Sequence, residues 1–108
     1  MVNRVYLLGN VGTDPQVSGN DTSKMVGFAL ATQERYRRNN EISESTEWHK
    51  IVAFGNLATF ASQYVAKGKQ IFVEGKIHTR QYRDREGVER TITEIVANDI
   101  KLCGKKEQ

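Results

Sequence analysis

Apolar and polar residues alternate along much of the chain with the two-residue period of β-strands. In "MVGFALAT", for example, Val26, Phe28 and Leu30 fall on one face of the segment. The opposite face carries the small residues Gly27, Ala29 and Ala31. Because small side chains leave room above a strand, this second face allows another backbone or a ligand to come close.

Five segments carry a strand pattern of this kind. They are Val2–Gly9, Met25–Thr32, Thr46–Phe54, Gln70–Tyr82 and Thr91–Leu102. The polar segment 35–45, "RYRRNNEISES", has no apolar period and is predicted to be a mobile loop at the tip of a long hairpin. A second hairpin tip is predicted around Gly87, in "RDREGVER".

After the third strand the period changes to that of a helix. The apolar stripe consists of Leu57, Phe60, Ala61, Tyr64 and Val65. We expect Asn56 to cap this helix, Gly68 to follow its end, and the stripe to pack as core over one mouth of a barrel. Three strands, a helix and two more strands, with antiparallel strands joined by long polar hairpins, predict an all-β fold. It is a five-stranded Greek-key barrel of the oligonucleotide-binding (OB) type, with one short helix between strands three and four and long hairpin loops.

The length of 108 residues suits a single domain, expected at residues 1–103, with a short frayed end at 104–108. The single cysteine, Cys103, excludes an internal disulfide and indicates a reducing compartment. No apolar run is long enough to span a bilayer, and the N-terminus lacks a signal-peptide pattern. These properties predict a cytoplasmic protein without a membrane partner.

Charge alone does not identify a partner, because 16 Lys and Arg against 13 Asp and Glu give a net charge of only +3. The placement of charge is more informative. On the third strand, Trp48, Lys50 and Phe54 share one face, and on the fourth strand Arg80 and Tyr82 do the same. Aromatic rings that stack on bases, beside cations that follow phosphates, indicate binding of single-stranded nucleic acid.

Both predicted hairpins repeat this mixture. Tyr36 lies among arginines in "ERYRRNN", and Tyr82 lies among arginines in "RQYRDR". The alternatives are that the basic loops are simply a solvated surface and that Trp48 fills the core. Phe54 has a stronger claim to a core position, since it lies at the buried end of its strand.

Four motifs, "NRVYLLGNVGTDPQV", "STEWHKIVAFG", "YVAKGKQIFVEGKIHTRQY" and "TITEIVA", occur in an order and at spacings that resemble the bacterial-type single-stranded DNA-binding proteins. The resemblance covers about Asn3 to Leu102. It implies a homotetramer that binds single-stranded DNA without strong sequence preference and protects it during replication, recombination and repair. It implies no catalysis and no cofactor, and it places the protein at the nucleoid.

The resemblance also implies roles for individual residues. Tyr36, Trp48, Phe54 and Tyr82 match base-stacking positions, and Lys50, Lys67 and Arg80 match phosphate-contacting positions. His78 stands where a second arginine is common, and Asn56 replaces a frequent lysine. With the hairpin cations, the candidate DNA-binding residues are Tyr36, Arg37, Trp48, Lys50, Phe54, Lys67, His78, Arg80, Tyr82 and Arg85.

A second set is implied at contacts between subunits. His49 matches a contact residue, and Arg4 and Glu74 match an oppositely charged pair between dimers. Phe72 and Lys76 flank Glu74 on the same strand face and share this expectation. Early residues on that face are thus expected to meet other subunits, and later ones to meet DNA.

The C-terminal sequence "CGKKEQ" departs from the family, whose bacterial members usually continue into a linker and an acidic tip that recruits other proteins. The sequence is either an excised core domain or a naturally short member, and recruitment through such a tip is not expected. Rival functions are a related primosome accessory barrel, typically dimeric, and a barrel used only for protein–protein contacts. A nuclease is disfavoured because no acidic cluster is present, and His49, His78 and Cys103 lack metal-ligand spacing.

Overall fold

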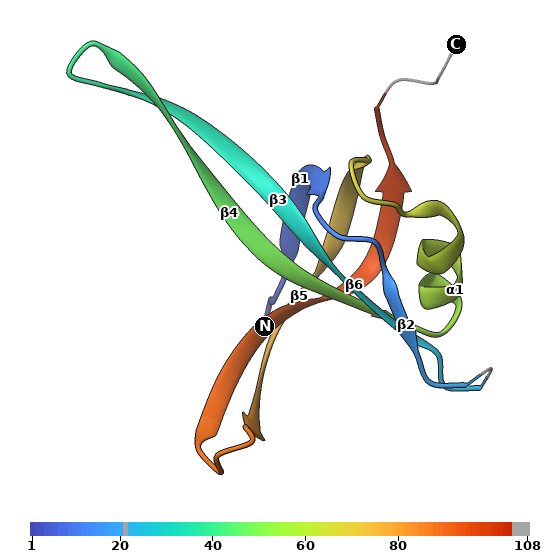
Figure 1. Ribbon diagram of the computed structural model, residues 1–108. Coiled ribbons are helices and arrows are strands. Elements are labelled where there is room, and N and C mark those ends of the chain that lie inside the picture. The colour runs from blue at the N-terminus through green and yellow to red at the C-terminus, as the bar shows by residue number, and fades with distance from the viewer. Residues whose placement is uncertain (21, 105–108) are drawn as a thin grey trace.

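The computed structural model describes residues 1–20 and 22–104, so the predicted frayed end lies outside it except for Gly104. The described chain forms six strands and one helix around a barrel from which two hairpin arms project (Figure 1). The elements are β1 (Val5–Val11), β2 (Gln16–Ser18), β3 (Met25–Arg38), β4 (Glu41–Phe54), α1 (Gly55–Tyr64), β5 (Gln70–Arg83) and β6 (Glu89–Leu102).

The strand order is β1-β5-β6-β4-β3-β2, and an additional pairing between β1 and β3 closes the barrel. This confirms the predicted OB-type barrel with its helix after the third long strand. The short strand β2 was missed. Both long hairpins are antiparallel, as predicted, and the alternation pattern did not indicate the parallel pairing of β4 with β6. A parallel pair needs a long crossover connection, and here α1 and β5 supply it.

The barrel consists of two well-paired halves. One contains β1, β5 and β6, joined by ladders of six and thirteen residue pairs. The other contains β2, β3 and β4, in which β3 and β4 alone share fourteen pairs. Only two pairs join β1 to β3 and only two join β4 to β6, so two short seams connect the halves.

The core follows the predicted alternation. Val26 and Leu30 of β3, Ile51 of β4, and Ile71 and Val73 of β5 are completely buried inside the barrel. Each of these residues shares its strand face with other apolar side chains at two-residue spacing. Removal of this apolar surface from water is the main source of the barrel's stability.

The helix differs from its prediction at both ends. It begins at Gly55 directly after β4, with Phe54 rather than Asn56 at the N-cap position and no side-chain capping bond. It ends at Tyr64, four residues before Gly68. Ala58 and Ala61 are buried against the barrel, whereas Tyr64 is 51% exposed, so its assignment to the core is wrong.

The segment 35–45, predicted to be a mobile loop, is instead a regular antiparallel ribbon that continues β3 and β4 away from the barrel (Figure 1). The chain reverses at Asn39 and Asn40, whose φ angles are +52° and +65°. Two consecutive left-handed residues are the requirement of a tight type I′ hairpin turn, and Asn tolerates this conformation well. No apolar period is needed because both faces of the ribbon meet water.

The tip of the β5–β6 arm is organised by Asp84. Its Oδ1 accepts hydrogen bonds from the backbone N–H groups of Glu86 and Val88, both at 2.9 Å. Its Oδ2 accepts a hydrogen bond from Arg90 Nε at 3.0 Å. Arg90 and, next, the Val88 N–H group hold the pKa of the Asp84 carboxyl below its ordinary value of 3.8. Gly87 supplies the left-handed residue that completes the predicted tip.

Candidate nucleic-acid interface

A groove of about 1350 Å³ crosses the outer surface of the barrel, over strands from both halves. Its aromatic and charged lining comprises Trp48, His49, Lys50, Phe54, Lys76, His78, Arg80 and Glu94. Gly27 and Ala29 of β3 also line it, so the small residues identified in the sequence leave space above their strand. The groove is therefore open and partly aromatic, and its cationic side chains outnumber its acidic ones.

Strand β4 supplies the aromatic side chains of the groove. Trp48 is 59% exposed and Phe54 is 53% exposed, so neither belongs to the core. Lys50 lies between them on the same strand face, opposite Ala29 in the β3–β4 ladder. The large side chains of β4 thus stand beside the small ones of β3, which leaves their rings accessible.

Trp48 is held in place by a residue that the sequence pattern did not single out. The loop after β1 runs against β3, where Gly12 N–H donates to the Ala29 carbonyl at 2.8 Å. A β-carbon added to Gly12 would overlap the Trp48 indole. One edge of the ring therefore packs on bare backbone, while much of the side chain faces solvent.

Strand β5 supplies the cations of the opposite wall. Lys76, His78 and Arg80 occupy alternate positions on its outer face, and all three line the groove. Lys76 was expected at a subunit contact, but in this structure it stands in the groove wall with the candidate phosphate-binding residues. Lys76 lies in the groove lining and Glu74 does not, and an irregularity in the β5–β6 register separates the two residues.

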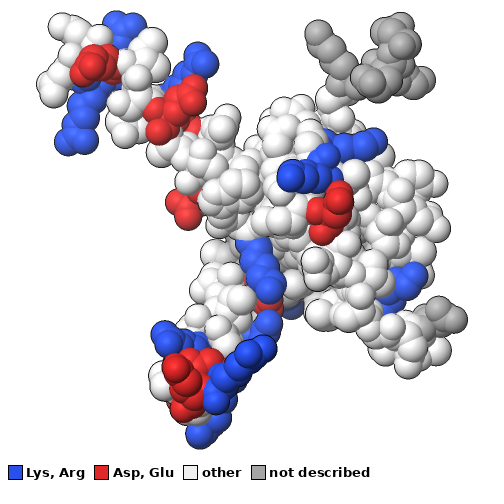
Figure 2. Space-filling view, viewed as in Figure 1, with Lys and Arg blue, Asp and Glu red and all other residues white. Residues whose placement is uncertain are grey.

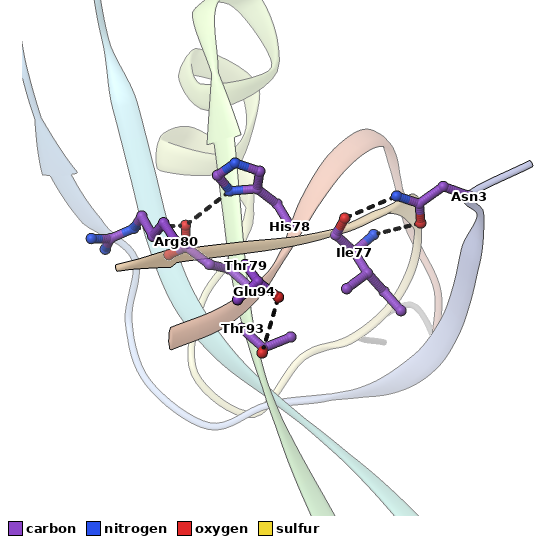
Figure 3. Close-up of polar contacts among 7 residues, drawn as sticks. All are labelled: Asn3, Ile77, His78, Thr79, Arg80, Thr93 and Glu94. Atoms are coloured by element: carbon purple, nitrogen blue, oxygen red, sulfur yellow. Dashed lines mark hydrogen bonds and ion pairs between the residues drawn. The ribbon is translucent and has the colours of Figure 1, made fainter. Parts of the chain in front are cut away.

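Glu94 of β6 is a buried carboxylate on the floor of the groove, and the sequence pattern gave it no role. Arg80 Nε donates to Glu94 Oε1 at 3.0 Å, and His78 Nδ1 lies 3.9 Å from the same oxygen (Figure 3). His78 and Glu94 are direct partners in the β5–β6 ladder. The ladder is symmetric about Glu86, one residue before the predicted tip at Gly87, so counting outwards from Glu86 brings His78 and Glu94 together.

The remaining candidate DNA-binding residues lie outside the groove. Tyr36 and Arg37 are exposed on the β3–β4 arm, and Tyr82 and Arg85 are exposed on the β5–β6 arm. Figure 2 shows Lys and Arg side chains gathered on both arms, interspersed with acidic ones. Lys67 lies in the loop after α1, where its backbone N–H donates to Asp14 at 2.9 Å.

The two arms relate differently to the groove. Tyr82 shares a strand face with Lys76, His78 and Arg80, so it extends the groove wall along the arm. Tyr36 lies opposite Ser43 in the ladder, which places it on the ribbon face of His49 and not on that of Trp48. Candidate stacking residues therefore occupy both faces of the β3–β4 ribbon.

The candidate contact residues lie mainly on the outer face of β1 and β5. Arg4 Nη1 and Glu74 Oε2 are 3.8 Å apart within the same chain. Beside them the rings of Tyr6 and Phe72 stack with centroids 6.2 Å apart. His49 alternates with Trp48 along β4 but also contributes to the groove lining, and its Nε2 is 2.9 Å from Thr32 Oγ1.

Metal-binding and membrane-spanning features are absent from the part of the chain that the structure describes. Within residues 1–20 and 22–104, no group of three or more His, Cys, Asp or Glu side chains could hold a metal ion. In the same ranges, no helix has the length and apolar character needed to cross a membrane.

Comparisons with known proteins agree with this geometry. The model of the single-strand binding protein family matches residues 2–103. A single-stranded DNA-binding protein of Bacteroides thetaiotaomicron is 45% identical over 97% of this chain, and one of Neisseria meningitidis is 39% identical over 99%. The chain spans 68% and 63% of the length of these two relatives.

Among solved structures, the Plasmodium falciparum SSB complex with ssDNA superposes with a TM-score of 0.86. Its sequence is 33% identical, and the match covers 96% of this chain and 97% of the other. The family match spans nearly every described residue, including both walls of the groove. This chain belongs to the single-strand binding protein family.

Proposed function

We propose that this protein binds single-stranded DNA through the groove, with little sequence preference. The observation that carries the proposal is the exposure of Trp48 and Phe54 on the same barrel surface as Lys50, Lys76 and Arg80. Every base offers a flat π-face to a stacking ring, whatever its identity, and every nucleotide carries a phosphate. A surface built from rings and cations therefore selects unpaired strands without reading their sequence.

Within this proposal, Trp48, Phe54, Tyr82 and Tyr36 stack on bases. Lys50, Lys76, Arg80 and, when protonated, His78 face phosphates, and Arg37, Arg85 and Lys67 extend the cationic path beyond the groove. The continuity of Tyr82 with the groove wall supports a path along the β5–β6 arm. The position of Tyr36 on the other ribbon face supports a path that passes around the β3–β4 arm.

The cellular role that fits this activity is to hold single strands open and protected during replication, recombination and repair. Such a role requires binding and no catalysis, in agreement with the family. The bacterial relatives are named for binding single-stranded DNA, and the Plasmodium structure is a complex with ssDNA, so both support this partner. Action at the nucleoid in the cytoplasm follows from this role.

We further propose that the protein acts as a homotetramer. Tyr6 and Leu8 of β1 are 60% and 55% exposed, and with Phe72 they form an apolar patch on the outer face of the β1–β5 pair. Arg4 and Glu74 border this patch and supply charges at its edge. Burial of the patch against another copy would remove it from water, and His49 would then mark a further contact.

Trp48 provides a direct test because it is the only tryptophan in the chain. Titration with oligo-dT should quench its fluorescence, and duplex DNA of the same length should not. Trp48→Ala should weaken binding, measured by anisotropy of labelled oligo-dT, by about 1–3 kcal/mol. Tyr64→Ala is the matched control, since Tyr64 is similarly exposed but lies on α1, away from the groove lining. Equal affinity for single-stranded and duplex DNA would exclude the proposal.

A further inference from the structure

Glu94 is an anomaly in a groove that is proposed to hold phosphates. Its side chain is only 6% exposed, yet it lies on the groove floor among residues of positive charge. A carboxylate at this place repels a polyanion, and its burial costs free energy unless it is paired. A buried carboxylate is needed neither to bind DNA phosphates nor to pack a barrel core.

The contacts of Glu94 are directed to the cations of the groove. Arg80 donates to it through Nε, and the His78 ring lies within 4 Å of the same oxygen (Figure 3). Lys50 of β4 and Lys76 of β5 line the same groove from the two strands that neighbour β6. No buried side-chain nitrogen or oxygen within the described ranges lacks a hydrogen-bond partner.

The geometry of the Arg80 contact is specific. A guanidinium group has five N–H donors, and the bond to Glu94 uses the single Nε donor. The four donors on Nη1 and Nη2 make no hydrogen bond to any residue that the structure describes. Arg80 is 46% exposed, so this outer fork is accessible from the groove. A fork of this shape matches a phosphate with two parallel hydrogen bonds.

We propose that Glu94 is a positioning residue for DNA binding: its buried carboxylate anchors Arg80 through Nε and holds the outer guanidinium fork towards the phosphate backbone. The inference rests on the proposed function of the groove. A flexible arginine loses much rotamer freedom when it binds a phosphate, and an anchor within the protein meets that cost before DNA arrives. Glu94 therefore raises affinity although its own charge opposes the ligand.

The two effects of Glu94 have opposite signs, which makes the proposal testable. If repulsion is the only effect, Glu94→Gln tightens oligo-dT binding and steepens its salt dependence. If Glu94 positions Arg80, the same change weakens binding about five- to tenfold, the loss expected for one hydrogen bond of ordinary net strength. The slope of log K against log salt should also become shallower by about 0.7, the value of one single-strand phosphate contact.

A double-mutant cycle separates positioning from a general loss of structure. Glu94→Gln, Arg80→Ala and the double variant are compared in oligo-dT titrations at several salt concentrations, with unfolding temperatures measured for each. Glu94→Gln should add no further loss once Arg80 is removed. Thr93→Ala is the matched control, because Thr93 is the strand neighbour of Glu94 on the opposite face and its hydroxyl contacts Thr79 at 3.4 Å (Figure 3).

A second variant covers the case in which Glu94→Gln fails to fold. Arg80→Lys keeps the charge but lacks both the Nε donor and the fork. Arg80→Lys should bind oligo-dT less tightly than the wild type, although the number of positive charges in the groove is the same. Equal affinity and an equal salt slope would overturn the proposal. Tighter binding by Glu94→Gln, or an equal loss with and without Arg80, would overturn it as well. If the wild-type protein itself failed to bind oligo-dT, the proposed function would be wrong, and not this assignment alone.

Discussion

The backbone of Gly12 packs against the indole of Trp48 so closely that a β-carbon at Gly12 would lie 2.8 Å from Cη2 of the ring. This contact joins the loop after β1 to the strand that carries the candidate stacking residues. It places one edge of the indole against backbone, while the side chain stays 59% exposed and accessible to a stacking base.

Gly12→Ala should therefore displace the Trp48 ring and weaken oligo-dT binding by roughly 1 kcal/mol, the lower end of the range for one stacked base. Trp48 emission in the free protein should shift as well, since the environment of the indole changes. The control is the same substitution in a Trp48→Ala background, where it should have no further effect on affinity. An equal loss in both backgrounds would show that Gly12 acts on the site by another route.

Lys76 distinguishes the observed groove from the subunit contact expected of it. Lys76→Ala should make the slope of log K against log salt shallower by about 0.7, because one phosphate contact is lost. The mass of the Lys76→Ala protein in solution, measured by light scattering, should equal that of the wild type. Lys101→Ala removes the same charge outside the groove lining and should leave the slope nearly unchanged. If Lys76→Ala changed the mass in solution but not the salt slope, Lys76 would be assigned to a subunit contact.

The patch of Tyr6, Leu8 and Phe72 is expected to hold copies of the chain together. Phe72→Arg places a charge beside the stacked Tyr6 ring and should lower the mass in solution below that of a tetramer. Ile42→Arg is the matched control, because Ile42 is an exposed apolar residue on the β3–β4 arm, far from this patch in sequence and fold. If both variants keep the wild-type mass, the patch does not mediate assembly.

Asp84 predicts a pH dependence confined to the tip of the β5–β6 arm. Its pKa is lowered in the folded tip, so the charged carboxylate stabilises the tip at pH values above the ordinary pKa of 3.8. This stabilisation is lost as the pH falls below 3.8 and the carboxyl becomes protonated. The Glu86 and Val88 amide signals in nuclear magnetic resonance spectra should move together over this acid range. In Asp84→Asn they should be insensitive to pH over the same range. Signals that move at higher pH would assign the effect to another group.

Residue alternation was sufficient to predict the outward positions of the aromatic and cationic side chains on β4. Trp48, Lys50 and Phe54 lie two or four residues apart on β4, and a strand whose inner residues are Ile51 and Ala53 must turn the others outwards. The same argument separates Ile71 and Val73 from the cations of β5. The order of strands and helix along the chain could also be predicted, because each long strand is bounded by turn residues or by the helix.

Alternation could not give the relations between strands. Whether Tyr36 shares a face with Trp48 depends on the register of β3 against β4, which the Asn39–Asn40 turn fixes and an apolar count does not. The parallel contact of β4 with β6 and the anchoring of Arg80 by Glu94 likewise depend on pairings distant in sequence. Gly12 gave no signal because its role is to leave empty the space that Trp48 fills.

The two short seams of the barrel have a mechanical consequence. Trp48, Lys50 and Phe54 stand on the half formed by β2, β3 and β4, whereas Lys76, His78, Arg80 and Glu94 stand on the half formed by β1, β5 and β6. Each seam consists of only two residue pairs, so the halves meet along the weakest lines of the backbone network. A nucleic-acid strand lying across the groove would contact both halves at once. The bound strand would therefore hold the two halves together and stabilise the barrel against separation at its two short seams.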